Sequence, residues 1–337
     1  MGRSKYRFLK MIIWTAPFMC IFLSLFIGRY PVDGYTVIKV LSSGMLGKTS
    51  GLSPIYDSLI LDIRLPRAVL GAVVGGSLAI SGGALQGLFR NPLVDAGILG
   101  VSSGAAFGAA LAILLFRQTF MIYLFAFVFG ILAVYLSYQV GKIYHTAANV
   151  MLVLGGVVVS SVFSALVSFI KFVADPYDQL PQIVFWLMGS LASSNIAEIK
   201  FSVIPMTAGI IGLLAIRWRI NVLSMGDKEA QALGVDLTIA KGIVIISTTM
   251  ATAAAVCVSG TIGWIGLIIP HVGRMLVGND NKVLLPVSLS LGACFLILID
   301  NMGRIISEGE LPLNILTALL GAPFYVYLIK KTKGGGW

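Results

Sequence analysis

Charged residues are scarce in this chain of 337 residues, at 11% of the total, and acidic residues number only 14. A soluble domain carries about 25% charged residues, so this composition excludes an ordinary soluble protein. Hydrophobic residues make up 58%, and the mean hydropathy is +0.95. These values predict one polytopic membrane domain over 1–337, with short loops.

Cysteine and histidine are also rare, with three and two residues. Cys20, Cys257 and Cys294 all fall in apolar stretches, so we expect small buried side chains, no disulfide and no metal site. His145 and His271 have no cluster of acids around them in the sequence. We therefore expect no cofactor and no catalytic activity. An ion-driven carrier needs acids or histidines at the midplane, so energy for transport would come from a partner.

Basic residues are the one charged class in excess, with 24 Lys and Arg and a net charge of +10. No basic patch with interleaved aromatic residues occurs, which argues against nucleic acid as a partner. The excess instead predicts cytoplasmic loops in the inner (cytoplasmic) membrane, by the positive-inside rule. With the N-terminus inside, 15 of the 24 basic residues fall in inner segments, whereas nine of the 14 acids fall outside. Both termini are therefore predicted to be cytoplasmic.

Ten apolar runs are predicted to cross the bilayer. They are predicted at 11–28, 63–87, 95–115, 119–140, 148–172, 196–216, 237–257, 262–277, 284–303 and 311–329. The eighth is short and contains Pro270, so it must lean on neighbouring helices. A further run at 181–191 is too short to span and is predicted to be a re-entrant or interfacial helix. Glycines at four-residue spacing, such as Gly71 with Gly75 and Gly104 with Gly108, predict helices that pack closely in lipid.

A nucleotide site of its own is not expected in this chain. The stretch Gly47-Lys48-Thr49 looks like the end of a phosphate-binding loop, but Ser42 stands where that loop needs glycine. The stretch also falls on the outer side, away from ATP.

The inner segment 217–241 is the longest predicted cytoplasmic loop. Its part from Gly226 to Gly234 has Ala230 and Leu233 on one side and polar residues elsewhere, and Gly234 is a natural helix stop. The pattern fits either a solvated loop helix or a docking element for a cytoplasmic motor.

Two arginines on the predicted outer side, Arg64 and Arg67, flank Pro66 at the start of the second span. Arg304 is expected to end the ninth span on the same face. These side chains could extend to lipid headgroups. Alternatively, they could bind carboxylates of an outer partner, since an arginine–carboxylate pair is bidentate and directional.

Six motifs occur together and in order along nearly the whole chain. They are "RLPR" (64–67), "GGALQGLFRNPLVDAGILGVSSGA" (82–105), "WLMGSL" (186–191), "GDKEAQALGV" (226–235), "GTIGWIGLIIPHVGR" (260–274) and "GELPLNILTALLGAPFYVYLI" (309–329). With them, the sequence resembles the permease subunits of type II ABC importers, which take up iron chelates, haem and cobalamin. The resemblance implies an all-α fold with about ten spans and both termini inside.

The same resemblance implies partners and roles. The partners would be a second permease subunit, expected to be an identical copy, two cytoplasmic ABC ATPase subunits, an extracytoplasmic substrate-binding protein and the lipid bilayer. The implied residues are Arg64, Arg67 and Arg304 for docking glutamates of the binding protein, Gly226, Glu229, Ala230, Leu233 and Gly234 for coupling to the ATPase, and Ala147, Ala148, Asn149 and Pro270 for the gate and translocation path.

The cargo is the least specified part of this hypothesis. A ferric siderophore is expected first, with haem, cobalamin and molybdate or tungstate as alternatives, and the pore lining is predicted to be apolar and small. The rival hypothesis is a secondary transporter or channel that works alone. It would need an ion site among the spans, and the sequence offers none.

Overall fold

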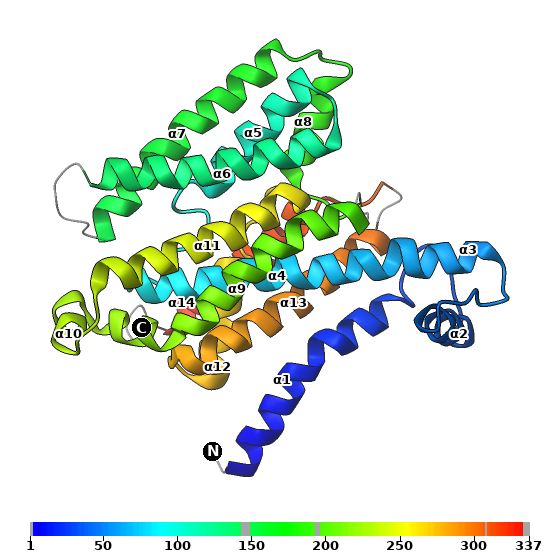
Figure 1. Ribbon diagram of the computed structural model, residues 1–337, viewed down its shortest axis with the longest axis horizontal. Helices are drawn as coiled ribbons and strands as arrows, with labels where there is room; N and C mark the ends of the chain where they lie inside the picture. Colours follow the sequence, from blue (N-terminus) through cyan, green and yellow to red (C-terminus); the bar gives the residue numbers. More distant parts are fainter. Residues whose placement is uncertain (1–2, 143–148, 193–195, 307–308, 333–337) are drawn as a thin grey trace.

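The computed structural model describes residues 3–142, 149–192, 196–306 and 309–332 (Figure 1), and this part of the chain forms helices joined by turns. The elements are α1 (Arg3–Ser24), α2 (Gly34–Met45), α3 (Pro54–Asp57), η1 (Ser58–Arg64, a π-helical stretch), α4 (Leu65–Phe89), α5 (Val101–Leu115), α6 (Thr119–Gly141), α7 (Asn149–Val173), α8 (Gln179–Met188), α9 (Ile196–Met225), α10 (Asp227–Ala232), α11 (Leu237–Ser259), α12 (Ile265–Val277), α13 (Asn281–Ile306) and α14 (Leu313–Thr332).

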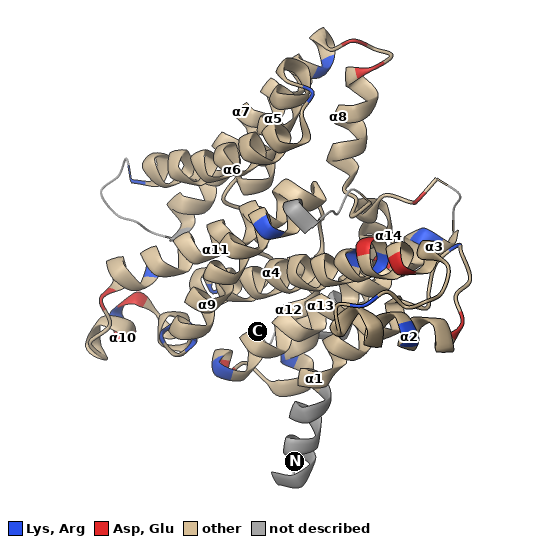
Figure 2. Ribbon diagram, turned by 45° about the vertical axis from the view of Figure 1, so that its right-hand side comes forward, with Lys and Arg blue, Asp and Glu red and all other residues tan. Residues whose placement is uncertain are grey.

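The ten predicted spans are confirmed as apolar helices. Six helices of the described residues are long and apolar enough to cross a membrane, and four shorter apolar helices fall on the remaining predicted spans. The short helix α8 occupies most of the predicted 181–191 segment. Charged residues gather towards the ends of the helices, away from their middles (Figure 2).

Several predicted boundaries were wrong. Helix α9 continues to Met225, so the first part of the predicted 217–241 loop, residues 217–225, is helical. Helix α5 begins at Val101, and residues 95–100, predicted as span, form turns. Helix α2 was not predicted at all. Pro66 does not start a span, because α3, η1 and α4 form one helical stretch from Pro54 to Phe89.

Helix α4 runs through the centre of the bundle (Figure 1), with α9 and α11 packed on one side and α12 and α13 on another. The most apolar window of the Pro54–Phe89 stretch is 83% buried. A helix that is apolar on every side must be enclosed by protein or lipid, and here protein encloses it. Helices α5 to α8 pack together as a second group beside this centre.

Glycine contacts set the closest helix crossings, as the four-residue spacing predicted. A Cβ atom on Gly75 would lie 2.3 Å from the carbonyl oxygen of Gly292 in α13. A Cβ atom on Gly104 of α5 would lie 2.3 Å from the carbonyl oxygen of Phe129 in α6. Side chains at these points would push the helices apart, so the glycines allow the backbones to touch.

Candidate functional site

The outer end of α4 carries a buried arginine bound by two acids. The Arg67 guanidinium reaches Asp300 of α13, with Nη2 2.8 Å from Oδ1 and Nε 3.0 Å from Oδ2. It also reaches Glu310, just before α14, with Nη1 2.9 Å from Oε1. Charged pairs of this geometry are strong and directional. Arg67 therefore links three segments that are far apart in sequence.

The other two outer arginines join the same region. Arg304 Nε lies 3.2 Å from Asp300 Oδ2, and its Nη1 donates to the carbonyl oxygen of Ile27. Arg64 donates to the carbonyl oxygens of Leu25 and Tyr30, at 2.7 and 2.5 Å. Arg64 and Arg304 thus fix the segment that follows α1.

Burial of these arginines differs from the exposed setting expected from sequence. Arg64, Arg67 and Arg304 are only 3%, 7% and 8% exposed. They lie against protein rather than extending to lipid headgroups. The structure confirms that they share one end of the bundle, and their docking role stays a prediction.

The segment predicted for coupling forms a short helix, α10, between two glycines with positive φ angles, Gly226 at 141° and Gly234 at 77°. Ala230 is fully buried, whereas Leu233 is 58% exposed. Lys241 of α11 pairs with Asp227 at 2.8 Å and fixes the start of α10. Leu233 is therefore the apolar side chain that this segment leaves uncovered, and Ala230 anchors it.

Glu229 curls back over the start of the same segment. Its Oε2 lies 2.0 Å from the position a Cβ atom on Gly226 would take, so a side chain there would displace it. Arg90, at the end of α4, also lies beside Gly226, with Nη1 3.5 Å from that position. The end of α4 and the coupling segment are thus neighbours.

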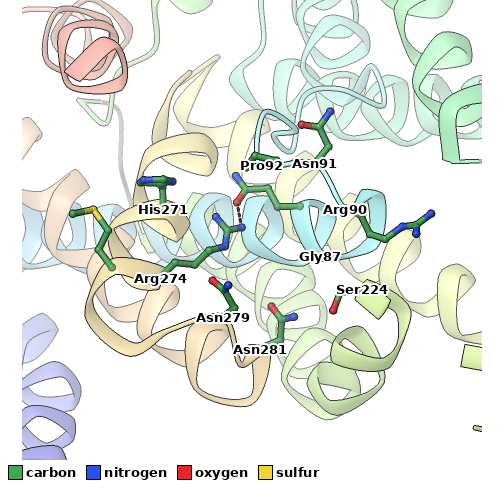
Figure 3. Close-up of a pocket in the computed structure, with 11 residues that line it drawn as sticks. Gly87, Arg90, Asn91, Pro92, Ser224, His271, Arg274, Asn279 and Asn281 are labelled. Atoms are coloured by element: carbon green, nitrogen blue, oxygen red, sulfur yellow. Dashed lines mark hydrogen bonds between the residues drawn. The ribbon is translucent and has the colours of Figure 1, made fainter. Parts of the chain in front are cut away.

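A polar pocket of about 450 Å³ lies next to this segment (Figure 3). Its lining includes Arg90, Asn91, Ser224, Arg274 and Asn279, and no acidic side chain among the described residues. Figure 3 shows the Arg274 guanidinium directed into the pocket. The arrangement offers hydrogen-bond donors at the inner end of the bundle.

Arg274 is held from one side only. Its Nη2 donates to Gln86 Oε1, and Gln86 Nε2 donates to the carbonyl oxygen of Gly266 at 3.1 Å. Its Nη1 is buried and has no hydrogen-bond partner within the described residues. A buried cationic donor without a partner is costly. Arg274 Nη1 is therefore suited to donate a hydrogen bond to an acceptor from another molecule.

Close to the pocket, Asn221 of α9 donates a hydrogen bond to Asp280 Oδ1 at 2.6 Å. This bond lowers the pKa of the Asp280 carboxyl. It ties the inner end of α9 to the start of α13.

Comparison with known proteins shows to which family this helical chain belongs. The model of the FecCD transport family matches residues 16–331. The chain belongs to the FecCD transport family. It is thus a multi-pass permease subunit of an ABC importer in the inner membrane and is not itself catalytic. The stand-alone carrier suggested as a rival is not supported.

Relatives within the FecCD family cover nearly the whole chain. The molybdate import permease MolB of Haemophilus influenzae is 41% identical over 93% of each chain. The ferric enterobactin permease FepD of Escherichia coli is 36% identical over 97% of this chain and 95% of its own. A solved inward-facing structure of a metal-chelate type ABC transporter has a TM-score of 0.87 at 38% identity and covers 97% of this chain and 100% of its own.

The residues predicted for the gate and translocation path of this FecCD permease fall at or just before the start of α7 and in α12. Ala147 and Ala148 lie outside the described residues, and α7 begins at Asn149. Pro270 is buried in α12, where Gly83 of α4 packs against its ring. Both assignments therefore stay predictions.

Three acids of the FecCD permease were missed from the sequence. Asp300 and Glu310 were counted as outer acids, but their pairing with Arg67 was not foreseen because it joins distant segments. Asp95 was placed at the edge of a span, whereas it is a half-buried turn residue that accepts a hydrogen bond from the Gly97 backbone N–H at 2.9 Å. The sequence Asp95-Ala96-Gly97 is a turn signal that could have revealed it.

Proposed function

We propose that this permease works as a homodimer with two cytoplasmic ATPase subunits and an extracytoplasmic binding protein, and imports a metal compound. A ferric siderophore is the first cargo to test, followed by haem, cobalamin and molybdate or tungstate. Relatives in this family are named for molybdate, haemin, cobalamin and ferric enterobactin.

The observation that carries the proposal is the coupling segment. Helix α10 is a rigid, anchored element at the inner end of the 30-residue helix α9. Its buried Ala230 and its Asp227–Lys241 ion pair fix its orientation, and Leu233 is left uncovered. An ATPase that binds this segment would transmit its movement directly to α9 and α11. The donor-rich inner pocket beside it would be covered by the same partner.

The second permease subunit would cover helix α7. This helix leaves a broad apolar face open, with Val150, Leu154, Val157 and Val158 all more than half exposed. A second copy of the chain would bury that face and bring two α7 helices together across a two-fold axis. We assign the gate to 147–149, where α7 begins. Cysteine at Asn149 should then crosslink between subunits in one transport state and not in the other.

The outer arginines would form the docking region for glutamates of the binding protein. Glu310 is the most accessible member of the cluster, since its side chain is 35% exposed whereas that of Arg67 is 8% exposed. A glutamate from a docked protein would replace Glu310 on Arg67. Charge complementarity of this kind sets orientation and association rate more than affinity.

Reconstitution tests the proposal. The permease is placed in vesicles with and without its ATPase and ATP, with the binding protein and labelled cargo outside. Uptake should occur only in the complete system. Uptake by the permease alone would overturn the proposal in favour of a secondary transporter.

A further inference from the structure

A polar cavity of about 320 Å³ opens between α5, α7 and the end of α8. Four serines line it, Ser102 and Ser103 from α5 and Ser164 and Ser168 from α7. Lys171 lines it too, and within the described residues it is the only charged side chain that does. The lining of this cavity is therefore polar, whereas the sequence predicted an apolar pore lining.

The polar residues of α7 form one edge of its exposed surface. Ser164, Ser168 and Lys171 are spaced by four and three residues, so they lie on one face of the helix. Val162 and Phe169 are also exposed but lie further round the helix and do not line the cavity. An apolar edge suits lipid or a partner helix, whereas a polar edge within a span faces water or cargo.

The cavity borders a deeper one, with which it shares two lining residues. A second cavity of about 420 Å³ shares Ser102 and Thr261 with the first and reaches Leu78, midway along α4. Asp95 and Asn314 line this deeper part. Polar residues thus extend from the outer half of α7 to the middle of the bundle.

Short helices begin around the deeper cavity, a feature typical of transport paths. Helix α5 has 15 residues and α12 has 13, and their first turns lie beside this space. Non-helical backbone at membrane depth is tolerated where it is enclosed by protein or lines a water-filled cavity. Half-length helices that start at mid-depth are used by other transporters to build substrate sites.

The outer cavity carries a positive charge from Lys171. Lys171 lies in the last turn of α7, where a lysine side chain can extend to the membrane surface or turn towards the cavity. Within the described residues, Lys171 forms no salt bridge, and the serine hydroxyls beside it add hydrogen-bonding capacity. The deeper Asp95 has the opposite charge, and its carboxylate is held in its own turn by the Gly97 N–H. The positive site favours anions over cations, whereas an ionised carboxylate further along the path would repel an anion and so weaken its retention.

We infer that Lys171, with Ser164, Ser168, Ser102 and Ser103, forms an anion-binding subsite on the cargo path, and that the cargo is an anionic metal compound. The inference rests on the proposed importer function and narrows its cargo class to metal oxyanions and acidic metal chelates. Neutral cargo gains nothing from this site.

A first experiment measures the local charge without knowledge of the cargo. Ser168→Cys is introduced into the full-length permease in lipid nanodiscs, and its reaction rates with anionic and cationic methanethiosulfonate reagents are compared. The parent chain, with its three native cysteines, gives the background. Replacing Lys171 by Met should lower the anionic-to-cationic rate ratio about ten-fold, as expected for one charge at about 6 Å in water.

Ser161→Cys is the matched control on the same helix, since it lies outside the cavity lining and about 15 Å along the axis from Lys171. Its ratio should change less than two-fold because salt screens a charge at that distance. An unchanged ratio at Ser168→Cys would show that Lys171 extends to the lipid surface, and would overturn the inference.

A second experiment measures transport in the complete reconstituted system, with molybdate, a ferric tris-catecholate siderophore and cobalamin as separate probes. Lys171→Met should reduce uptake of a transported anion at least ten-fold, Lys171→Arg should preserve most of it, and Lys200→Met, an exposed lysine outside the cavity, should leave it unchanged. ATP-dependent uptake of cobalamin, or uptake of an anion that Lys171→Met does not affect, would overturn the inference but leave the importer function standing. Loss of ATP dependence would instead overturn the importer function.

Discussion

Arg67 and Asp300, which are 233 residues apart in the chain, form a two-point ion pair that is buried at the outer end of the bundle. Removing one member would leave the other as an uncompensated charge, which costs about 3–5 kcal/mol. We expect Arg67→Met and Asp300→Asn each to reduce the free energy of unfolding by roughly this amount. The double variant should lose less than the sum, because the two changes remove one interaction.

Denaturation of the four proteins in mixed micelles measures this coupling. If Arg67→Met unfolds like the parent protein, the pair has no structural role.

Glu310 gives a way to separate structure from docking. Because it is partly exposed, Glu310→Gln should destabilise the protein less than the Asp300 variant does. If binding-protein glutamates replace Glu310, the same variant should bind the binding protein about five-fold more tightly, since an internal competitor for Arg67 is weakened. Affinity for the reconstituted transporter at low and moderate salt checks this. Unchanged or weaker binding would argue against docking at Arg67.

The close crossing of α4 and α13 is sensitive to a single methyl group. Gly75→Ala would place a Cβ atom 2.3 Å from the Gly292 carbonyl oxygen, so the helices would have to separate. We expect a loss of folded protein after extraction and a loss of several kcal/mol of stability. Gly242→Ala in α11 is the control, because its Cβ would meet nothing within 4 Å. It should be neutral or stabilise the helix by about 1 kcal/mol; equal behaviour of both variants would contradict the packing argument.

Two neighbouring positions in the coupling segment should respond differently to a carboxylate. Leu233→Glu alters an exposed apolar contact, so the permease should fold normally while ATP-driven uptake falls at least ten-fold. Ala230→Glu forces a charge into a fully buried position and should reduce the yield of folded permease. Monodispersity in detergent and cargo-stimulated ATP turnover separate the two effects. Normal turnover with Leu233→Glu would rule out this segment as the ATPase contact.

Sequence reasoning succeeded where the signal is local. Long apolar runs predicted the ten apolar helices, whereas the orientation inferred from loop charges stays a prediction. Glycine spacing predicted which surfaces approach closely, as at Gly75. The short helix α10 was predicted because Gly226 and Gly234 bracket a short amphipathic stretch; its coupling role stays a prediction.

Sequence reasoning failed where a side chain's environment depends on residues that are distant in the chain. Arg67 was expected to be exposed because nothing in its neighbourhood shows that Asp300 and Glu310 reach it. The apolar lining predicted for the pore overlooked Ser164, Ser168 and Lys171, although their spacing of four and three residues was visible. Helix α2 was missed because the stretch from Gly34 to Met45 is short and mixes polar with apolar residues.

Helix α4 is one continuous helix at the centre of the bundle, so its two ends move together. Arg67 near the outer end and Gln86 near the inner end are about 28 Å apart along an unbroken axis. The first is clamped by Asp300, and the second holds Arg274 beside the coupling segment. A rotation or translation of α4 at one end would therefore also move the other end. Under the proposed docking at Arg67, arrival of a loaded binding protein would shift Arg274 and the coupling segment through this one helix.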